Sequence, residues 1–226
     1  MVARAAKKVF DQVKASAAPN TPIIWSEYNA TYMTEQEVTD SAFIGPWLAN
    51  NIRECDGLAN IMSYWSFSDV FEEQGVVKTP YYGGYGLIAE RDIPKASFRA
   101  FQLLHGLGDR RFPVTSQNAL VTKRADGTLV IALWNYAEPG EKGAPKTFRL
   151  DFKGGSFSGY RMQFVDPNHG SSLKAWKDMG GPVSPTLNQI ERIKAASVLP
   201  PAEQHAMGEI TLQPQELAVL ELRPQP

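Results

Sequence analysis

Cysteine and histidine are scarce in this sequence, and their scarcity excludes several kinds of chemistry. The one cysteine, Cys55, cannot form a disulfide within the chain, so the fold does not depend on an oxidising compartment. The three histidines, His105, His169 and His205, are scattered and offer no metal-ligand spacing. No glycine-rich loop ends in Lys-Ser or Lys-Thr, and no motif indicates a Ser–His nucleophile. The sequence therefore predicts neither a metal centre nor a phosphate-binding loop.

An excess of charge of either sign is also missing, as is any long apolar run. The 23 basic and 24 acidic side chains give a formal net charge of -1, which supplies no field that would attract nucleic acid or an anionic membrane. The chain has no stretch of ~18 apolar residues, and its first residues lack the apolar core of a signal peptide. We expect a neutral partner, no nucleic acid and no membrane, while the choice between a cytoplasmic and a secreted protein stays open.

What is present suffices for a globular core, because 43% of the 226 residues are hydrophobic. The run Ile23-Ile24-Trp25 is too short for a helix and does not alternate, so it predicts a strand buried on both faces, and residues 58–65 predict a second buried strand. Amphipathic patterns predict helices at 2–14, from Thr39 or Asp40 to about residue 52, and at 94–107. This alternation is typical of a parallel α/β sheet or barrel, where catalytic groups collect at the C-terminal ends of strands.

Beyond Gly108 the hydrophobic pattern becomes that of antiparallel strands. Residues 129–136, 148–152, 160–165 and 217–222 predict strands, and a helix is predicted near 185–196. We therefore expect two domains, an α/β domain over residues 1–107 and an antiparallel β-sandwich over residues 108–226.

Carboxylates beside aromatic residues are the remaining candidates for chemistry, and they follow the two predicted parallel strands. Glu27 ends the first strand close to Tyr32, and Glu72 and Glu73 follow the second, close to Trp65. Sugars need this combination, because their C–H faces stack on aromatic rings while their hydroxyls bond to carboxylates. Composition alone leaves a simpler alternative, in which Glu27 only ends a strand and the Glu72–Glu73 pair is solvated.

Other conspicuous residues have a structural explanation. We expect the indole rings of Trp25, Trp47, Trp134 and Trp176 to lie in the core, since large aromatics dominate cores. His169 follows Asp, Pro and Asn, which predicts a turn. Cys55 is expected to be an inert buried thiol.

Six motifs are spread over nearly the whole chain: IWSEYN at 24–29, SYWSFSDVFEE at 63–73, GGYGLI at 83–88, IPK at 93–95, VDPNH at 165–169 and WKDMG at 176–180. Together they resemble family 39 of the glycoside hydrolases, the β-xylosidases. The resemblance implies a (β/α)8 TIM barrel followed by a β-sandwich, with the last two barrel strands within residues 1–107. It also implies that Glu27 is the nucleophile and that Trp65, Glu72 and Glu73 bind xylose. Tyr32 is a weaker match to the same subsite.

The sequence departs from the family in its chemistry and in its length. A retaining glycosidase needs two carboxyl groups ~5–5.5 Å apart, and the Asn-Glu-Pro motif that supplies the family's acid/base residue is missing here. Two parallel strands cannot close a barrel, so open sheet edges would remain. We expect a truncated gene product, because the first helix begins without a cap. Alternatively, a partner complements the half-barrel, the chain self-associates to cover the gap, or the sandwich folds and the remainder of the chain adapts.

Two classes of function fit these features. In the first, the chain is part of a retaining β-xylosidase that releases terminal non-reducing xylose from xylo-oligosaccharides or β-xylosides by double displacement, without a cofactor. In the second, it is catalytically inactive, and its sandwich serves as a structural or carbohydrate-binding module. The missing acid/base residue separates the two, because the first function needs a carboxyl group that this chain does not supply.

Overall fold

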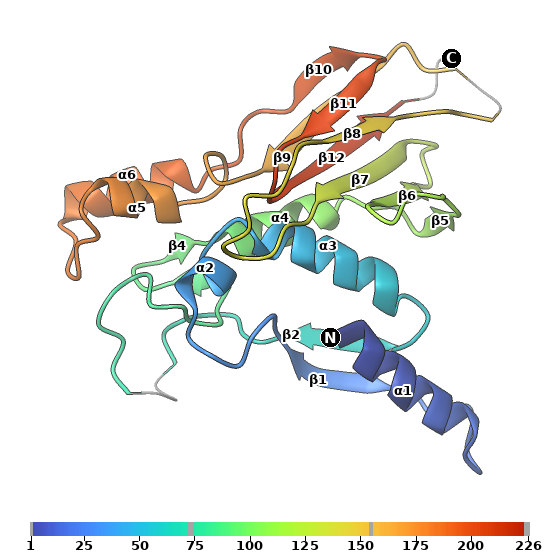
Figure 1. Ribbon diagram of the computed structural model, residues 1–226, viewed down its shortest axis with the longest axis horizontal. Coiled ribbons are helices and arrows are strands. Elements are labelled where there is room, and N and C mark those ends of the chain that lie inside the picture. Colours follow the sequence, from blue (N-terminus) through green and yellow to red (C-terminus); the bar gives the residue numbers. More distant parts are fainter. Residues whose placement is uncertain (1, 72–74, 154–155, 224–226) are drawn as a thin grey trace.

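The computed structural model describes residues 2–71, 75–153 and 156–223, and Figure 1 shows the order of its elements. The first part of the chain contains α1 (Val2–Lys14), β1 (Ile24–Tyr28), α2 (Gln36–Thr39), α3 (Ile44–Cys55), β2 (Ile61–Tyr64), β3 (Ile88–Ala89), β4 (Ile93–Pro94) and α4 (Ala96–Leu104). The second part contains β5 (Arg110–Phe112), β6 (Ala119–Lys123), β7 (Leu129–Asn135), β8 (Lys146–Arg149), β9 (Gly159–Val165), α5 (Leu173–Asp178), α6 (Leu187–Ala196), β10 (Glu203–Ala206), β11 (Glu209–Leu212) and β12 (Glu216–Leu222).

Strands β1 and β2 pair in parallel and form a two-stranded sheet, in which Ile24 lies opposite Ile61. One face of this sheet is open, since Ile24 is 61% exposed and Ile61 is 53% exposed. On the other face, the Tyr28 ring stacks on Trp47 of α3 with centroids 5.9 Å apart. The prediction that the first strand is buried on both faces and the second is buried as well is therefore wrong, because the described part of the chain covers only one face.

A six-stranded antiparallel sheet forms the centre of the second part, in the order β10-β9-β12-β7-β6-β5. Strand β12 lies between β9 and β7, so that Leu217 is opposite both Val165 and Trp134. Nearly every residue of β7 and β12 is buried. These two strands have apolar side chains on both faces because each face of the sheet is covered.

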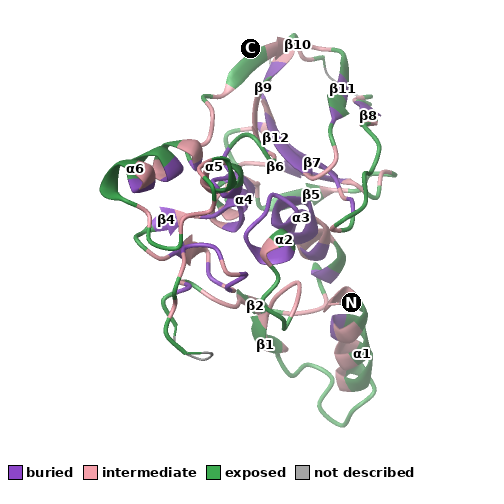
Figure 2. Ribbon diagram, turned by 60° about the vertical axis from the view of Figure 1, so that its left-hand side comes forward, coloured by how far each residue is buried: buried purple, intermediate pink, exposed green. Residues whose placement is uncertain are grey.

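Helices α3 and α4 cover one face of this sheet, and the two-stranded β8–β11 sheet lies over the other (Figures 1 and 2). Between the helices and the sheet, Leu48 and Ala100 pack with Trp134 and Leu217. On the opposite face, the core residues include Ile131, Phe148, Ile210 and Leu220. One core thus joins elements from both sides of residue 108, and the domain boundary proposed there stays a prediction.

Helix α3 approaches the sheet closely because its second residue is glycine. A Cβ atom on Gly45 would lie 3.2 Å from Val165 Cγ1, which is tighter than ordinary packing. Pro46 follows in the first turn of α3, where its missing N–H has no partner to lose. The Gly45-Pro46 pair therefore fits the start of a helix that packs on a sheet.

A third core lies where α5 and α6 meet the segments around β3 and β4. It is built from Tyr81, Ala89, Ile93, Leu173 and Ile193. The phenol of Tyr81 is buried and donates to Ser172 Oγ at 2.6 Å, and Ser172 donates to the Pro94 carbonyl. This core anchors the irregular chain that precedes α4.

Several predicted elements are present with shifted ends. The predicted strands at 129–136, 160–165 and 217–222 correspond to β7, β9 and β12, and the helix predicted near 185–196 corresponds to α6. The helix predicted from Thr39 or Asp40 corresponds to α3, which begins later, at Ile44, and the short helix α2 lies before the predicted start. Neither residue is an N-cap of α3, because both are buried and the Asp40 carboxylate binds Lys95 and Gly83. Within the described ranges, every helix falls short of the length and apolarity needed to cross a bilayer.

Candidate functional site

Glu27 lies near the C-terminal end of β1, where the strand contains an extra residue. Trp25 is opposite Met62 but Tyr28 is opposite Tyr64, so β1 uses one more residue than β2 between these pairs. Strict alternation would put Glu27 on the covered side with Trp25. Instead, Ser26 and Glu27 are both exposed. Extra residues of this kind re-aim side chains and are frequent next to active sites.

Trp65 follows β2 directly and lies beside the end of β1. Its backbone N–H donates to the Tyr28 carbonyl at 3.0 Å, and the Asn29 side-chain amide donates to the Trp65 carbonyl. The half-buried indole packs edge-on against the Phe71 ring, with centroids 5.5 Å apart. The fold thus brings the C-terminal ends of the two parallel strands together, as the alternating pattern predicted.

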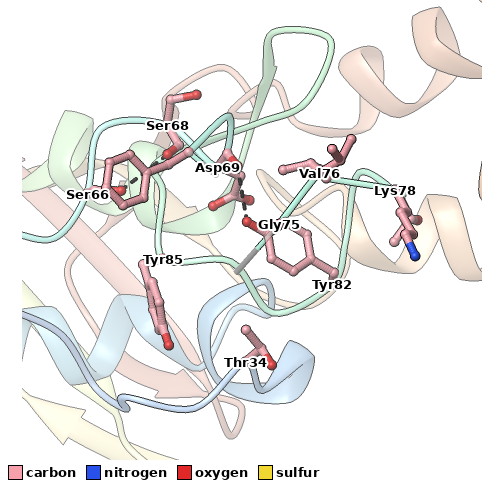
Figure 3. Close-up of a pocket in the computed structure, with 12 residues that line it drawn as sticks. Thr34, Ser66, Ser68, Asp69, Gly75, Val76, Lys78, Tyr82 and Tyr85 are labelled. Atoms are coloured by element: carbon pink, nitrogen blue, oxygen red, sulfur yellow. Dashed lines mark hydrogen bonds between the residues drawn. The ribbon is translucent and has the colours of Figure 1, made fainter. Parts of the chain in front are cut away.

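A cavity of about 340 Å³ opens next to this point (Figure 3). Its lining includes Ser66, Ser68, Phe71, Tyr82 and Tyr85, which combine aromatic rings with hydroxyl groups. The volume lies at the lower end of the range of small-molecule pockets, ~300–1,000 Å³. Neither Glu27 nor Trp65 is among the described residues that line it, so the cavity adjoins the predicted site without containing it.

A buried ion cluster adjoins the cavity, and one of its members, Asp69, is among the residues that line it. The Lys95 ammonium group is 2.6 Å from Asp40 Oδ1 and 3.0 Å from Asp69 Oδ2, and all three side chains are inaccessible to solvent. Burial raises the pKa of Asp40 to about 6, although Lys95 and the Gly83 N–H favour the carboxylate. Burial likewise raises the pKa of Asp69. For Lys95, burial lowers the pKa but the two carboxylates more than offset it, so the pKa is raised.

Sequence reasoning missed the roles of Asp40 and Lys95. In the sequence, Lys95 stands out only as the end of the IPK motif, and Asp40 only as a candidate helix cap. Lysine and aspartate are almost never fully buried unless paired. A pairing between residues so far apart in the chain leaves no local signal.

The remaining predicted site residues differ in what the structure says of them. Tyr32 is 88% exposed, and its backbone carbonyl accepts a hydrogen bond from Tyr85 Oη at 2.6 Å. Glu72 and Glu73 lie outside the described residues. No group of three or more His, Cys, Asp or Glu within the described ranges could hold a metal ion. The roles of Glu27, Trp65 and Tyr32 stay predictions.

The residues that we expected to have a structural role differ in how deeply they are buried. The indole of Trp134 is fully buried and that of Trp47 is 8% exposed, whereas Trp25 and Trp176 are only partly buried. Cys55 is a buried free thiol. His169 lies in a tight turn, since its N–H and carbonyl both pair with the backbone of Asp166.

Comparison with known proteins gives a consistent picture. The family described as glycosyl hydrolases family 39 matches residues 1–208. A β-xylosidase of Geobacillus stearothermophilus is 34% identical over 205 residues, which are 90% of this chain and 39% of that protein. A β-xylosidase of Caldicellulosiruptor saccharolyticus is 26% identical over 187 residues. The solved family 39 β-xylosidase of Caulobacter crescentus superposes with a TM-score of 0.83 at 26% identity, covering 99% of this chain and 49% of that one.

The mixed α/β fold, the polar strand ends and these relatives define the class of protein as a glycoside hydrolase. More specifically, the chain belongs to family 39 of the glycosyl hydrolases. It spans about two fifths of the length of the curated relatives and about half of the solved one.

Proposed function

We propose that this chain is the C-terminal part of the catalytic (β/α)8 barrel, together with the following β-sandwich, of a retaining β-xylosidase, and that Glu27 is its nucleophile. The observation that carries the proposal is the extra residue in β1, which leaves Glu27 exposed at the C-terminal end of a parallel strand. Catalytic residues of such barrels come from these strand ends. The names of the two curated relatives favour terminal xylose of xylo-oligosaccharides or β-xylosides as the substrate.

In the proposed reaction, a Glu27 carboxylate oxygen attacks the anomeric carbon of xylose. The bond to the leaving oxygen breaks as a second carboxyl group protonates that oxygen, and a covalent xylosyl ester forms on Glu27. The same second group then removes a proton from water, which attacks the anomeric carbon, breaks its bond to the Glu27 oxygen and releases xylose with retention. Trp65 and Tyr32 would contact the sugar face, while Glu72 and Glu73 would bond to its hydroxyls.

The second carboxyl group would come from outside this chain, because the Asn-Glu-Pro motif is missing from the sequence. The same outside segment would complete the sheet. Parallel sheets are almost always covered on both faces, whereas Ile24 and Ile61 are exposed on one face of β1–β2. A polypeptide corresponding to the half of the relatives that this chain does not match would supply both the missing strands and the acid/base residue.

A labelling experiment tests the role of Glu27 without the acid/base residue. A 2-fluoro xyloside with dinitrophenolate as leaving group needs little protonation to react, and the fluorine slows hydrolysis of the ester. We expect slow release of one equivalent of dinitrophenolate and a mass increase on the peptide that contains Glu27. Glu27→Ala should abolish both, while Glu209→Ala, at an exposed position on β11, should leave both unchanged.

Two outcomes would contradict the proposal. Dinitrophenolate release that survives Glu27→Ala would remove Glu27 from the role of nucleophile. Tight binding of xylo-oligosaccharides without any labelling would instead support a carbohydrate-binding module.

A further inference from the structure

Lys95 is the centre of a cluster that the proposed reaction does not use. Its ammonium group contacts Asp40 Oδ1 at 2.6 Å and Asp69 Oδ2 at 3.0 Å, and it donates to the Gly84 carbonyl at 2.8 Å. The contacts with Asp69 and Gly84 are hydrogen bonds, and the contact with Asp40 is an ion pair. Asp69 is among the residues that line the cavity, but its side chain is inaccessible to solvent, and Lys95 and Asp40 are not among the described lining residues.

The second oxygen of each carboxylate binds the glycine-rich backbone at residues 83–86. Asp40 Oδ2 accepts from the Gly83 N–H at 2.7 Å, and Asp69 Oδ1 accepts from the Gly86 N–H at 2.5 Å. A Cβ atom on Gly86 would lie only 2.3 Å from the Asp69 nitrogen. Larger residues would therefore break this arrangement, and the cluster holds the segment at Gly83, Gly84 and Gly86.

The segment held in this way carries two rings of the cavity lining. Tyr82 precedes Gly83 and Gly84 and Tyr85 follows them, and both tyrosines line the cavity (Figure 3). The same segment is hydrogen-bonded to the chain just after β2, since the Ser66 N–H donates to the Tyr85 carbonyl at 2.9 Å. Displacement of the glycines would therefore displace both tyrosine rings and the cavity between them.

Stability alone does not require charges at this place. Replacing a buried ion pair by apolar residues of similar volume is often neutral or stabilising. Apolar side chains cannot form directional hydrogen bonds to the backbone, whereas the cluster bonds to the Gly83 N–H, the Gly84 carbonyl and the Gly86 N–H. The cluster therefore fixes one backbone conformation of this segment.

We propose that Asp40, Asp69 and Lys95 are positioning residues, which hold the 82–86 segment so that Tyr82 and Tyr85 are set for sugar binding. The inference rests on the proposed function only for the identity of the ligand as a sugar.

The test uses a variant of the chain in which the cluster is neutral. Lys95→Met alone would leave two buried carboxylates unpaired, so it is combined with Asp40→Asn and Asp69→Asn to keep similar volumes without charge. Tyr81→Phe is the matched control, because it removes a buried hydrogen bond in the adjoining core but leaves the cluster intact. We expect the triple variant to bind xylobiose at least tenfold more weakly by NMR titration, and the control to change its affinity less than twofold.

Amide hydrogen exchange provides the second measurement. The Gly83 and Gly86 amides should exchange at least tenfold faster in the triple variant, while the amides of β7 keep their protection. A folded triple variant with unchanged affinity and exchange would overturn the inference. Xylobiose binding that is undetectable in the wild type would count against the proposed function, and the exchange of Gly83 and Gly86 would then decide the positioning role. If the triple variant does not fold, Asp69→Asn undergoes the same two measurements, with the same outcomes deciding.

Discussion

Glu27 and Asp40 are carboxyl groups that lie close in the sequence but have opposite environments. Glu27 is exposed beside an extra residue of β1. Asp40 is 1% exposed and bound by Lys95 and the Gly83 N–H. At the scale of single residues, the extra residue in β1 leaves the Glu27 carboxyl group available for chemistry. The contact with Lys95, 55 residues further along the chain, makes the Asp40 carboxyl group unavailable.

The raised pKa of Asp40 predicts a pH dependence of stability. Its pKa is about 6 in the folded chain against an ordinary 3.8, so the folded form holds a proton that the unfolded form loses between these values. Stability should therefore fall as the pH rises from 4 to 6, and a difference of this size corresponds to about 3 kcal/mol at most. Asp40→Asn cannot titrate, so its urea midpoint should fall less over this range.

Asp151→Asn is the control for this measurement, because it removes an exposed carboxyl group. It should follow the wild-type pH profile. Parallel profiles for wild type and Asp40→Asn would show that Asp40 titrates normally in the folded chain.

At the scale of elements, α6 shows how a local sequence signal fixes a helix start. Thr186 Oγ1 accepts from the Gln189 N–H, and Gln189 Oε1 accepts from the Thr186 N–H at 2.8 Å, which together form a capping box. The helix then buries Ile190 and Ile193, and Ile193 belongs to the core with Tyr81 and Ile93. The cap of α6 therefore supports the core that adjoins the Lys95 segment.

Removal of this cap should have a measurable cost. Thr186→Ala is expected to lower the free energy of unfolding by about 1 kcal/mol, since the Gln189 N–H loses its side-chain acceptor. Gln189→Ala should cost less, and the double variant should cost less than the sum of the two because both act on one motif. Urea unfolding of the four proteins measures this coupling, and strictly additive effects would contradict a reciprocal cap.

At the scale of the whole molecule, the sheet β1–β2 is incomplete within the described residues. Its open face carries Ile24 and Ile61, and exposed strand edges and apolar side chains favour association. The matched relatives contain about as much chain again as this one, or more. A complementary polypeptide is therefore the occupant that we expect on this face.

A mixing experiment tests this expectation. The chain is combined with the part of the Geobacillus stearothermophilus β-xylosidase that it does not match, and association is measured by analytical ultracentrifugation. Ile61→Asp should weaken association at least tenfold, because it puts a charge on the buried interface. Val198→Asp, at a position that is 59% exposed on the chain after α6, should leave it unchanged. Equal weakening by both substitutions, or a homodimer that excludes the added polypeptide, would contradict the expectation.

The sequence by itself determined the elements whose signal is local. Short strand-like runs predicted β7, β9 and β12, a helix was predicted at the position of α6, and the motifs around Glu27 and Trp65 identified the family. It also predicted that polar strand ends would meet, because parallel strands align their carboxyl ends. Short elements without a strong pattern, such as α2, α5, β10 and β11, were missed.

Only the tertiary structure decided which surfaces are covered and which charges are paired. The apolar run Ile23-Ile24-Trp25 predicted burial, yet Ile24 is exposed because nothing in the described chain packs on that face. Asp40 stands where the sequence predicts a helix cap, yet its carboxylate binds Lys95 and the Gly83 N–H. Periodicity depends on neighbours along the chain, whereas burial and ion pairing depend on residues that folding brings together. The same sequence pattern is therefore compatible with a buried or an exposed side chain, and with a paired or an unpaired charge.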